Sequence, residues 1–463
     1  MNLPDVKDTI CALSTPSGMG ALAIIRLSGK ESFNIFSKIF SNKRISETKS
    51  HTAHFGLIKK DDVIIDEVVA VIFKGPNSFT GEDTVEISCH GSTYVQREIF
   101  NLLIENGARL AQAGEYTMRA YLNGKMDLSR AEAVTDLISS ESAAAHRVAM
   151  HQMRGGFSSE IGEFRSKLID FASLIELELD FGEEDVEFAD RTQLIELIDA
   201  LQAKTTDLIK SFRTGNAIKN GVPVAIIGSP NAGKSTLLNA LLNDDKALVS
   251  DIAGTTRDSI EDIIDIDGVL FRFIDTAGIR ETDDVVENLG IERAVKKANE
   301  ARIIILLVDI SSSTSEEINE DIMALKNMVT DDEQEYFIVL NKIDQLDDDA
   351  EVSIVSPAEI PVLSISAKDG DGISELKNSL SDSVSTKIGD TNQTLVTNIR
   401  HFQVLQKVDE SLKEVRSGLD TNLSGDLLAI DIRKALYHLG EVTGETTADD
   451  LLGNIFSRFC IGK

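Results

Sequence analysis

The stretch VAIIGSPNAGKSTLLNALL, residues 224–242, decides how the middle of this chain folds. Its start is apolar and β-branched, which predicts a strand, and its end has the leucine spacing of a helix. The connecting segment, residues 228–235, matches the pattern GxxxxGK[ST]. In a strand–loop–helix setting, the N–H groups of such a loop and of the helix N-terminus cradle phosphates. We therefore predict a phosphate-binding loop, with Lys234 at the β- and γ-phosphates and the Ser235 hydroxyl on Mg²⁺.

Apolar strand-like runs and amphipathic helical runs alternate around this loop, from Gly221 to about residue 384. Two of the strand-like runs are ARIIILLVDI at 301–310 and YFIVLNKID at 336–344. Such alternation indicates βαβ units, and it predicts a mostly parallel sheet with helices on both faces.

The tetrapeptide Asn341-Lys342-Ile343-Asp344 predicts which base is bound. A carboxylate at Asp344 can accept both hydrogens that guanine offers at N1 and N2, whereas adenine offers no such pair. Taken alone, the tetrapeptide is equally well explained as a polar turn at a strand end, but it follows the phosphate loop in the right order. Ser366-Ala367-Lys368 comes after the strand-like run VLSIS and would back the base with main-chain groups.

Two further segments are expected to sense the γ-phosphate. Thr256 in DIAGTTRD, residues 251–258, would complete the Mg²⁺ coordination. Asp275 would hold a water of the metal, and the N–H of Gly278 would touch the γ-phosphate. The predicted GTP-binding residues are Asn231, Ala232, Gly233, Lys234, Ser235, Thr236, Ser250, Asp251, Ile252, Ala253, Gly254, Thr255, Thr256, Asp275, Thr276, Ala277, Gly278, Asn341, Lys342, Ile343, Asp344, Ser366, Ala367 and Lys368.

The machinery for hydrolysis is less ordinary. In Ras-like enzymes a glutamine orients the attacking water, and the corresponding residue here is Ile279, which cannot. Another group must take its place; the charged residues close by in sequence are Glu287, Glu281, Arg280 and Arg257, and each is also explained as a solvated charge. Asn231 lies inside the phosphate loop, where its oxygen could hold a monovalent cation that supplies positive charge to the reaction.

The segments on either side of this region have other patterns. Residues 1 to about 120 read as mixed α/β, with strand-like runs such as ALAIIRLSG and EDTVEISCHG. From about residue 127 the spacing is helical for most of a hundred residues. After the polar linker SDSVSTKIGDTNQT, residues 381–394, helical spacing returns. The helices before and after the α/β region could pack on each other, which would make that region an insertion.

Composition restricts the classes of protein that remain. The 463 residues suggest about three domains, and no run of 18 apolar residues predicts a transmembrane helix. The start, MNLPDVKDTICAL, does not predict a secretory signal, and the odd, widely spaced Cys11, Cys89 and Cys460 predict a reduced, cytoplasmic protein. A net charge of −31 disfavours nonspecific binding of nucleic acid by the whole surface.

Several motifs together resemble the MnmE/TrmE family, GTPases that help to modify the wobble uridine of certain tRNAs. The resemblance runs from end to end and includes the terminus FCIGK, which ordinary GTPases lack. The remaining motifs that carry it are NSFTGED with Val85-Glu86, GEYTMRAYLNGKMDLSRAEA (114–133), GSPNAGKS, DIAGTTRD, DTAGIRE and NKID.

The resemblance implies a domain order. Residues 1–124 would form an α/β folate-binding domain that also forms the homodimer, and residues 221–384 a Ras-like G domain. That G domain would be inserted into a helical domain made of residues 125–220 and 385–463. The resemblance further implies a partner, the FAD-dependent protein MnmG. The pair would attach a carboxymethylaminomethyl group to C5 of the wobble uridine, using a tetrahydrofolate one-carbon donor.

The resemblance also assigns residues. Formyl-tetrahydrofolate would be contacted by Arg26, Glu86, Lys125 and Lys463; a potassium ion would be held by Asn231, Ser250, Ile252 and Thr255. Glu287 would position the attacking water indirectly. Cys460 matches the family's terminal cysteine; the alternative interpretation is that it packs as a small buried hydrophobic residue. Two residues depart from the family: Ser250 stands where threonine is common, and Gly124 where an acidic residue is common.

Two other classes of protein compete with this interpretation. A ribosome-assembly GTPase would add a KH-like domain or a second G domain, and the sequence contains neither pattern. A nucleotide-gated scaffold would use hydrolysis only to time assembly. The FCIGK terminus and the folate-type N-terminal region disfavour both classes.

Overall fold

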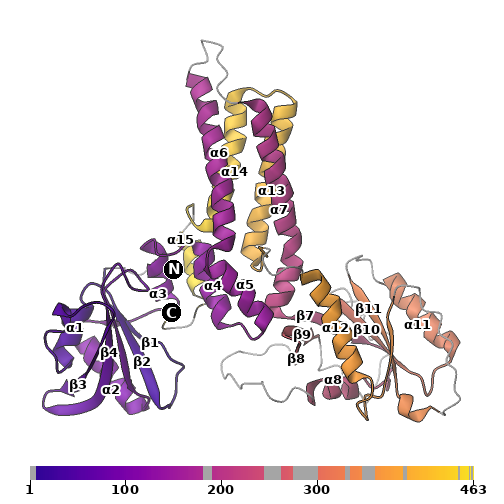
Figure 1. Ribbon diagram of the computed structural model, residues 1–463, viewed down its shortest axis with the longest axis horizontal. Helices are drawn as coiled ribbons and strands as arrows, with labels where there is room; N and C mark the ends of the chain where they lie inside the picture. Colours follow the sequence, from indigo (N-terminus) through magenta and orange to yellow (C-terminus); the bar gives the residue numbers. More distant parts are fainter. Residues whose placement is uncertain are drawn as a thin grey trace. The chain divides into compact units, whose positions relative to one another are not determined.

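The computed structural model describes residues 7–180, 190–243, 262–274, 301–328, 334–346, 360–388, 394–446, 449–457, 459 and 462. Contacts divide the chain into two compact units. Unit 1 comprises Met1–Ile138, His151–Thr205 and Val404–Lys463, and unit 2 comprises Ser139–Met150 and Thr206–Gln403. The architecture is multidomain, α/β plus α, as the sequence predicts (Figure 1). The domain boundaries near residues 124, 220 and 384 stay a prediction.

The N-terminal part of unit 1 is built on a six-stranded sheet of order β3-β4-β5-β2-β1-β6. Alternate side chains of its strands, such as Ile25, Ala70 and Ile87, pack with α1 and α2 in one buried core. The other face of these strands is therefore free of those two helices. The elements are β1 (Ile10–Leu13), β2 (Leu22–Ser28), α1 (Ser32–Ile39), η1 (Ile45–Glu47), β3 (Thr52–Lys60), β4 (Val63–Phe73), β5 (Thr84–His90), α2 (Thr93–Glu105) and β6 (Arg109–Leu110).

A buried ion cluster holds the loop that precedes β5. Arg119 is fully buried, and its guanidinium lies 2.6 Å from Asp8, 2.9 Å from Glu115 and 3.2 Å from Glu82. Glu82 also accepts a 2.8 Å hydrogen bond from the Ser28 hydroxyl at the end of β2. Removal of one partner from such a cluster leaves a buried charge uncompensated, at a cost of about 3–5 kcal/mol. The cluster therefore fixes residues 75–83 beside β2.

The rest of unit 1 is helical. In Figure 1, α6, α14 and the unit 1 residues of α7 and α13 run side by side. Ion pairs connect neighbours among them, including Arg433 to Glu176 at 2.6 Å and Lys434 to Glu414 at 2.6 Å. The helices that contain unit 1 residues are α3 (Glu115–Leu122), α4 (Leu128–Ile138), α5 (Ala143–Met153), α6 (Gly156–Asp180), α7 (Arg191–Asn220), α13 (Ile399–Asp420), α14 (Gly425–Thr443) and α15 (Asp449–Phe456).

Unit 2 contains the α/β region, with a six-stranded sheet of order β12-β11-β10-β7-β9-β8. Its strands pair in parallel except for β8, which is antiparallel to β9. The predicted mostly parallel sheet is confirmed. The elements are β7 (Val222–Ile227), α8 (Lys234–Asn243), β8 (Asp262–Ile266), β9 (Val269–Phe273), β10 (Ile303–Asp309), α11 (Ser315–Met328), β11 (Glu335–Asn341), η2 (Ile343–Gln345), β12 (Val362–Ile365) and α12 (Ile373–Ile388).

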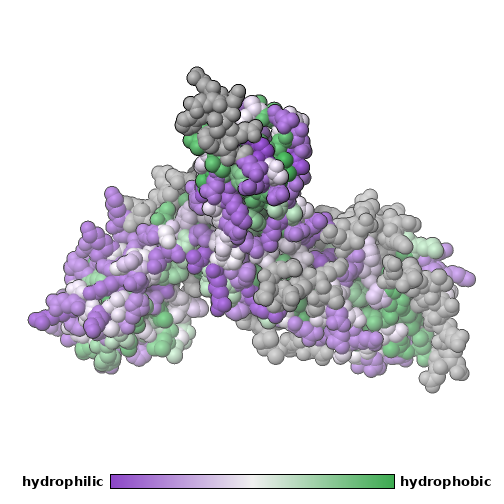
Figure 2. Space-filling view, turned by 45° about the horizontal axis from the view of Figure 1, so that its top comes forward, coloured by the Kyte–Doolittle hydropathy of each residue, from purple (hydrophilic) through white to green (hydrophobic). Residues whose placement is uncertain are grey.

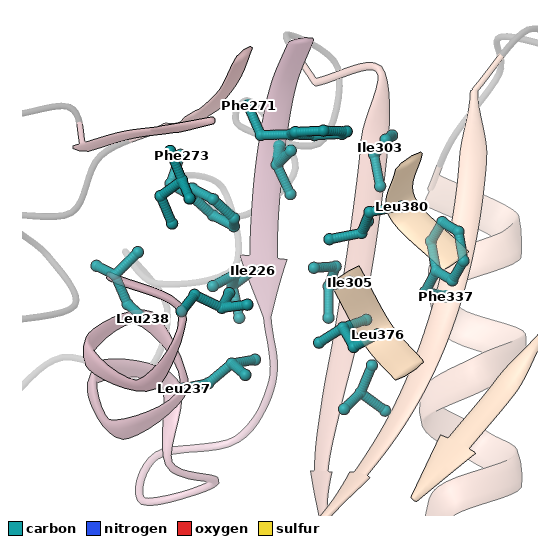
Figure 3. Close-up of a cluster of buried hydrophobic side chains, with 14 of the residues drawn as sticks. Ile226, Leu237, Leu238, Phe271, Phe273, Ile303, Ile305, Phe337, Leu376 and Leu380 are labelled. Atoms are coloured by element: carbon teal, nitrogen blue, oxygen red, sulfur yellow. The ribbon is translucent and has the colours of Figure 1, made fainter. Parts of the chain in front are cut away.

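Helices cover both faces of this sheet, because its central strand is apolar at every position but the last. Ile303 and Ile305 of β10 pack in the core that contains residues of α8 and α12 (Figure 3). Ile304 and Leu306 point to the opposite core, which contains residues of α11. Such two-sided burial is typical of strands in a parallel sheet. It places the carboxyl ends of β7, β10 and β11 along one edge.

The structure adds elements that the sequence analysis did not identify. The edge strand β8 carries only Ile264 and Ile266 on its buried face. The strands β1, β3 and β6 and the helix α1 were also not identified. These elements are short, or they lie at an edge where the apolar pattern is weak.

Candidate nucleotide-binding site

The phosphate loop connects the end of β7 at Ile227 to the start of α8 at Lys234. Its glycines are required by close packing. A Cβ atom at Gly228 would lie 2.1 Å from the carbonyl oxygen of Leu307, and one at Gly233 would lie 2.4 Å from Nδ2 of Asn341. Gly233 also has φ of +96°. The loop is thus pressed against the ends of β10 and β11, with its N–H groups available at the start of a helix.

The loop's cation is bound within the loop itself. Nζ of Lys234 donates hydrogen bonds to the carbonyl oxygens of Gly228 at 2.8 Å and Ser229 at 2.9 Å. This holds the ammonium over the concave loop, where phosphate oxygens bind in such sites. Ser235 is half-buried in the first turn of α8, and Asn231 is exposed with φ of +66°. Both residues lie in the positions that the motif predicts.

Asn341 joins the phosphate loop to the two base-binding segments. Its side chain is at the end of β11 and is almost fully buried. Nδ2 donates to the carbonyl oxygen of Ala232 at 2.8 Å, and Oδ1 accepts from the N–H of Ala367 at 3.0 Å. One amide thereby fixes the spacing between the predicted phosphate and base contacts.

Asp344 is exposed and partly pre-oriented. Its Oδ1 accepts a 2.8 Å hydrogen bond from the hydroxyl of Ser366, which is fully buried. A carboxylate that is held on one side and reaches solvent on the other suits recognition of two adjacent N–H groups. The structure therefore brings together the three described groups of predicted GTP-binding residues, namely 231–236, 341–344 and 366–368.

Lys342 contacts a residue that the sequence analysis missed. Lys342 has φ of +69°, a left-handed conformation that costs a non-glycine residue about 1–2 kcal/mol. Its Nζ lies 2.5 Å from Oδ2 of Asp309, the last residue of β10. Burial alone would raise the pKa of Asp309, but hydrogen bonds from Lys342 and Ser311 hold that pKa below its usual range. The sequence signal that could have found Asp309 is a single acidic residue at the end of the apolar run 303–308.

A second polar site lies on the N-terminal sheet. Arg26 of β2 and Glu86 of β5 are cross-strand partners, and Nε and Nη2 of Arg26 donate to Oε1 of Glu86 at 2.9 and 2.7 Å. The guanidinium carbon lies 5.5 Å from the ring centroids of both Phe79 and Tyr116. The arrangement is a paired charge beside two aromatic rings, on the sheet face away from α1 and α2.

Lys125 contacts the loop of residues 75–83, which precedes β5. Its Nζ donates to the carbonyl oxygen of Pro76 at 2.7 Å, and its Cγ lies 3.3 Å from a Cβ atom built on Gly81. Phe79, which faces Arg26, belongs to that loop too. Residues 75–83 therefore connect the three described members of the predicted folate set.

Comparison with known proteins identifies the family. A family model described as "MnmE helical domain" matches residues 128–460, and one described as "GTP-binding protein TrmE N-terminus" matches residues 9–125. A protein of Flavobacterium johnsoniae named "tRNA modification GTPase MnmE" is 54% identical over 99% of both chains. Proteins of the same name from Cytophaga hutchinsonii and Bacteroides thetaiotaomicron are 53% and 50% identical, over 98% and 99% of this chain and 98% and 100% of their own.

The chain belongs to the MnmE family of tRNA modification GTPases. The resemblance stated from its motifs is confirmed. Relatives named tRNA modification GTPase match both the N-terminal region and the helical region of this chain. This full-length match disfavours the two competing classes.

Some of the predicted site residues lie outside the described part of the structure. They are Ser250, Asp251, Ile252, Ala253, Gly254, Thr255, Thr256, Asp275, Thr276, Ala277, Gly278, Glu287, Cys460 and Lys463. Their roles stay predictions. Among the residues that are described, no three His, Cys, Asp or Glu side chains gather as a metal site, and no helix is long and apolar enough to cross a membrane.

Proposed function

We propose that this chain hydrolyses GTP in a K⁺-dependent manner and, with the flavoprotein MnmG, adds a carboxymethylaminomethyl group to C5 of the wobble uridine of certain tRNAs. The one-carbon unit would come from a tetrahydrofolate, 5-formyl-tetrahydrofolate or a related form. The observation that carries this proposal is the full-length similarity to MnmE proteins, combined with a pre-formed junction of phosphate loop and guanine loops at Asn341. A cytoplasmic location is part of the proposal.

The described residues fit the phosphates and the base of GTP, and Ser235 offers one oxygen to Mg²⁺. Glycines at 228 and 233 form a cradle that a Cβ atom would fill, as close approach of phosphates to the backbone requires. Ser235 and Thr256 would hold Mg²⁺, which neutralises charge on the phosphates when bound. Lys234 would leave its loop carbonyls for phosphate oxygens, and Asp344 would read the base. Asp275 would hold a water of the metal.

Potassium would enter through Asn231, Ser250, Ile252 and Thr255. The support is that Asn231 is exposed on the phosphate loop and that Ile279 cannot orient water. A cation there would supply the charge that an arginine finger supplies in other GTPases. The potassium ion would stabilise the charge that develops on the phosphates during hydrolysis and would not contact the base. Its removal should therefore lower turnover more than it lowers the affinity for nucleotide.

Replacement of K⁺ by Na⁺ at equal ionic strength is expected to lower kcat by about tenfold or more, because a fixed cation stabilises transition-state charge. The dissociation constant of GDP should stay nearly unchanged. Phosphate release at saturating GTP, with calorimetry of GDP in both salts, measures this. Equal turnover in the two salts would rule out the potassium proposal.

Folate would bind at the polar site of the N-terminal sheet. A pterin ring can stack on Phe79, which is half-buried, and the Arg26–Glu86 pair offers both donors and acceptors to its polar edge. Lys125 supplies positive charge at the same loop. Lys463 would complete the set.

Deletion of residues 460–463 is expected to weaken binding of 5-formyl-tetrahydrofolate by about tenfold or more, because one charged contact is lost. GTP hydrolysis should survive, since the deleted residues belong to the other unit. Calorimetry on the full chain and the truncated chain, with GTP turnover as the control, measures both effects. Unchanged folate affinity in the truncated chain would contradict the assignment.

The homodimer would form through the exposed apolar part of the N-terminal sheet, on the face away from α1 and α2. Phe55 pairs with Val69, Val69 with Ser88, and Ser88 with Ile24, which makes one row across four strands. Phe55 is 71% exposed and Leu22 is 66% exposed. A second copy would cover these side chains and would lie beside the proposed folate site. Sedimentation of the full chain as a monomer at micromolar concentration would contradict this proposal.

The proposed tRNA partner is a polyanion, and the protein is itself strongly acidic. Hydrophilic residues dominate the face drawn in Figure 2, with hydrophobic residues gathered in smaller groups. Since the net charge is −31, the phosphate backbone of tRNA would be repelled by much of the surface. We therefore propose that the flavoprotein supplies a large part of the tRNA contact and that this chain acts on the complex.

A further inference from the structure

We infer that Asp309 is a positioning residue for the guanine site, which it serves by holding the ammonium of Lys342. This inference deepens the proposed guanine-nucleotide function and rests on it. Asp309 is not one of the motif residues that read phosphate or base. It lies on the neighbouring strand and acts through Lys342.

The strands bring these residues together. β10 and β11 pair in parallel, and Asp309 is the register partner of Asn341, the residue before Lys342. The N–H of Ile310 donates to the carbonyl oxygen of Asn341 at 3.2 Å, so the strands stay joined at this point. This hydrogen bond ties the residue after β10 to the start of the guanine-binding turn.

The carboxylate of Asp309 is built to hold a cation. Its side chain is 9% exposed. Oδ1 accepts hydrogen bonds from the N–H of Ser311 at 3.0 Å and from its hydroxyl at 2.6 Å, and Oδ2 faces Nζ of Lys342 at 2.5 Å. Ser311 fixes one oxygen, so the other oxygen points at Lys342. A buried carboxylate with this geometry is strongly disfavoured without its cation.

The backbone of Lys342 explains why an anchor is useful. Lys342 has φ of +69° and begins the short η2 helix that carries Asp344. A left-handed residue at this point sets the direction of both the Lys342 side chain and the Asp344 carboxylate. With the ammonium tied to Asp309, the long methylene stem loses rotational freedom before a nucleotide arrives, so less entropy is lost on binding.

The expected effect is on affinity and not on the chemical step. Lys342 and Asp309 lie at the predicted base side of the site, joined through Asn341 to the loop that would bind phosphates. Their loss should weaken GDP and GTP alike, mainly by faster dissociation. Turnover of the Asp309→Asn variant at saturating GTP should stay within about twofold, because uniform binding does not change kcat.

The test is a double-mutant cycle on the full chain, with mant-GDP as the probe and stopped-flow fluorescence as the measurement. Asp309→Asn removes the charge and keeps the shape. Lys342→Met removes the ammonium and keeps the stem. Ser311→Ala is the matched control, because it removes only the hydroxyl, while the N–H of residue 311 still holds Oδ1 and the contact between Oδ2 and Lys342 is kept. Asp309→Glu restores the charge on a longer side chain.

Asp309→Asn should weaken mant-GDP binding by about tenfold, within the range of coupling between residues that touch. In the Lys342→Met background, the same change should have less than about twofold effect. Asp309→Glu should recover part of the affinity, and Ser311→Ala should bind nearly as the wild type does. If Asp309→Asn does not fold, Asp309→Glu in both backgrounds provides the cycle.

Equal effects of the Asp309 change in the two backgrounds would overturn the inference, since Asp309 would then act independently of Lys342. Wild-type affinity in a folded Asp309→Asn variant would overturn it too. Absence of mant-GDP binding by the wild-type chain is a different result, which would contradict the proposed function itself.

Discussion

Asp344→Asn is expected to weaken GTP and GDP binding by about 10²-fold or more and to admit xanthosine nucleotides in their place. The carboxylate of Asp344 would accept hydrogens from guanine N1 and N2, whereas an amide would present its own N–H group to one of them. Xanthine has a carbonyl oxygen at C2, which that N–H group can satisfy. The loss is large because a polar site penalises a mismatched partner more than an apolar pocket does.

Calorimetry of GDP and XDP binding to the two proteins measures this exchange. Asp371→Asn is the matched control, because Asp371 is an exposed aspartate in the loop after β12, and the same charge is removed there. The control should keep the wild-type preference for GDP. Unchanged GDP affinity in Asp344→Asn would mean that NKID is only a polar turn at the end of β11.

Glu287→Ala is expected to lower kcat by about 10²-fold or more while leaving GTP and GDP binding intact. Ile279 offers no hydrogen bond to water, so another group must orient or polarise the nucleophile. In GTPases, the segment after the DTAG sequence is reordered by the γ-phosphate, and Glu287 lies in that segment. A carboxylate can accept a proton or polarise a bridging water, which Arg280 cannot do.

Phosphate release under saturating GTP and K⁺ measures this effect, with Asp283→Ala as a control that removes an acidic charge from the same segment. The control should turn over as the wild type does. A loss confined to KM would indicate a binding role for Glu287. Near wild-type kcat in Glu287→Ala would transfer the role to another residue, and Glu281 is the next candidate.

The phosphate loop can be predicted from the sequence because its chemistry is local. A phosphate loop needs glycines and a lysine at fixed spacing, so residues 228–235 identify it without knowledge of the rest of the fold. Asp309 was missed for the opposite reason. Its partner, Lys342, is 33 positions away, and only the register of β10 against β11 brings the two together.

The N-terminal site shows the same limit. Taken by itself, Arg26 is a charge near the end of a strand, and its role was implied only by family resemblance. The structure pairs it with Glu86, 60 positions away, and places Phe79 and Tyr116 near it. Strand β8 was missed because two buried isoleucines in five residues give too short a pattern at an edge. Cross-strand pairing and edge strands are non-local properties that periodicity alone does not reveal.

The most direct measurement of the central claim is nucleoside mass spectrometry of tRNA from cells that lack this gene. Complementation with the wild-type chain should restore the C5-modified wobble uridine, and complementation with Lys234→Ala should not, because that variant lacks the cation proposed to bind phosphates. Full modification in the deletion strain, or in cells carrying only Lys234→Ala, would contradict the account of this chain as a GTPase that acts in tRNA modification.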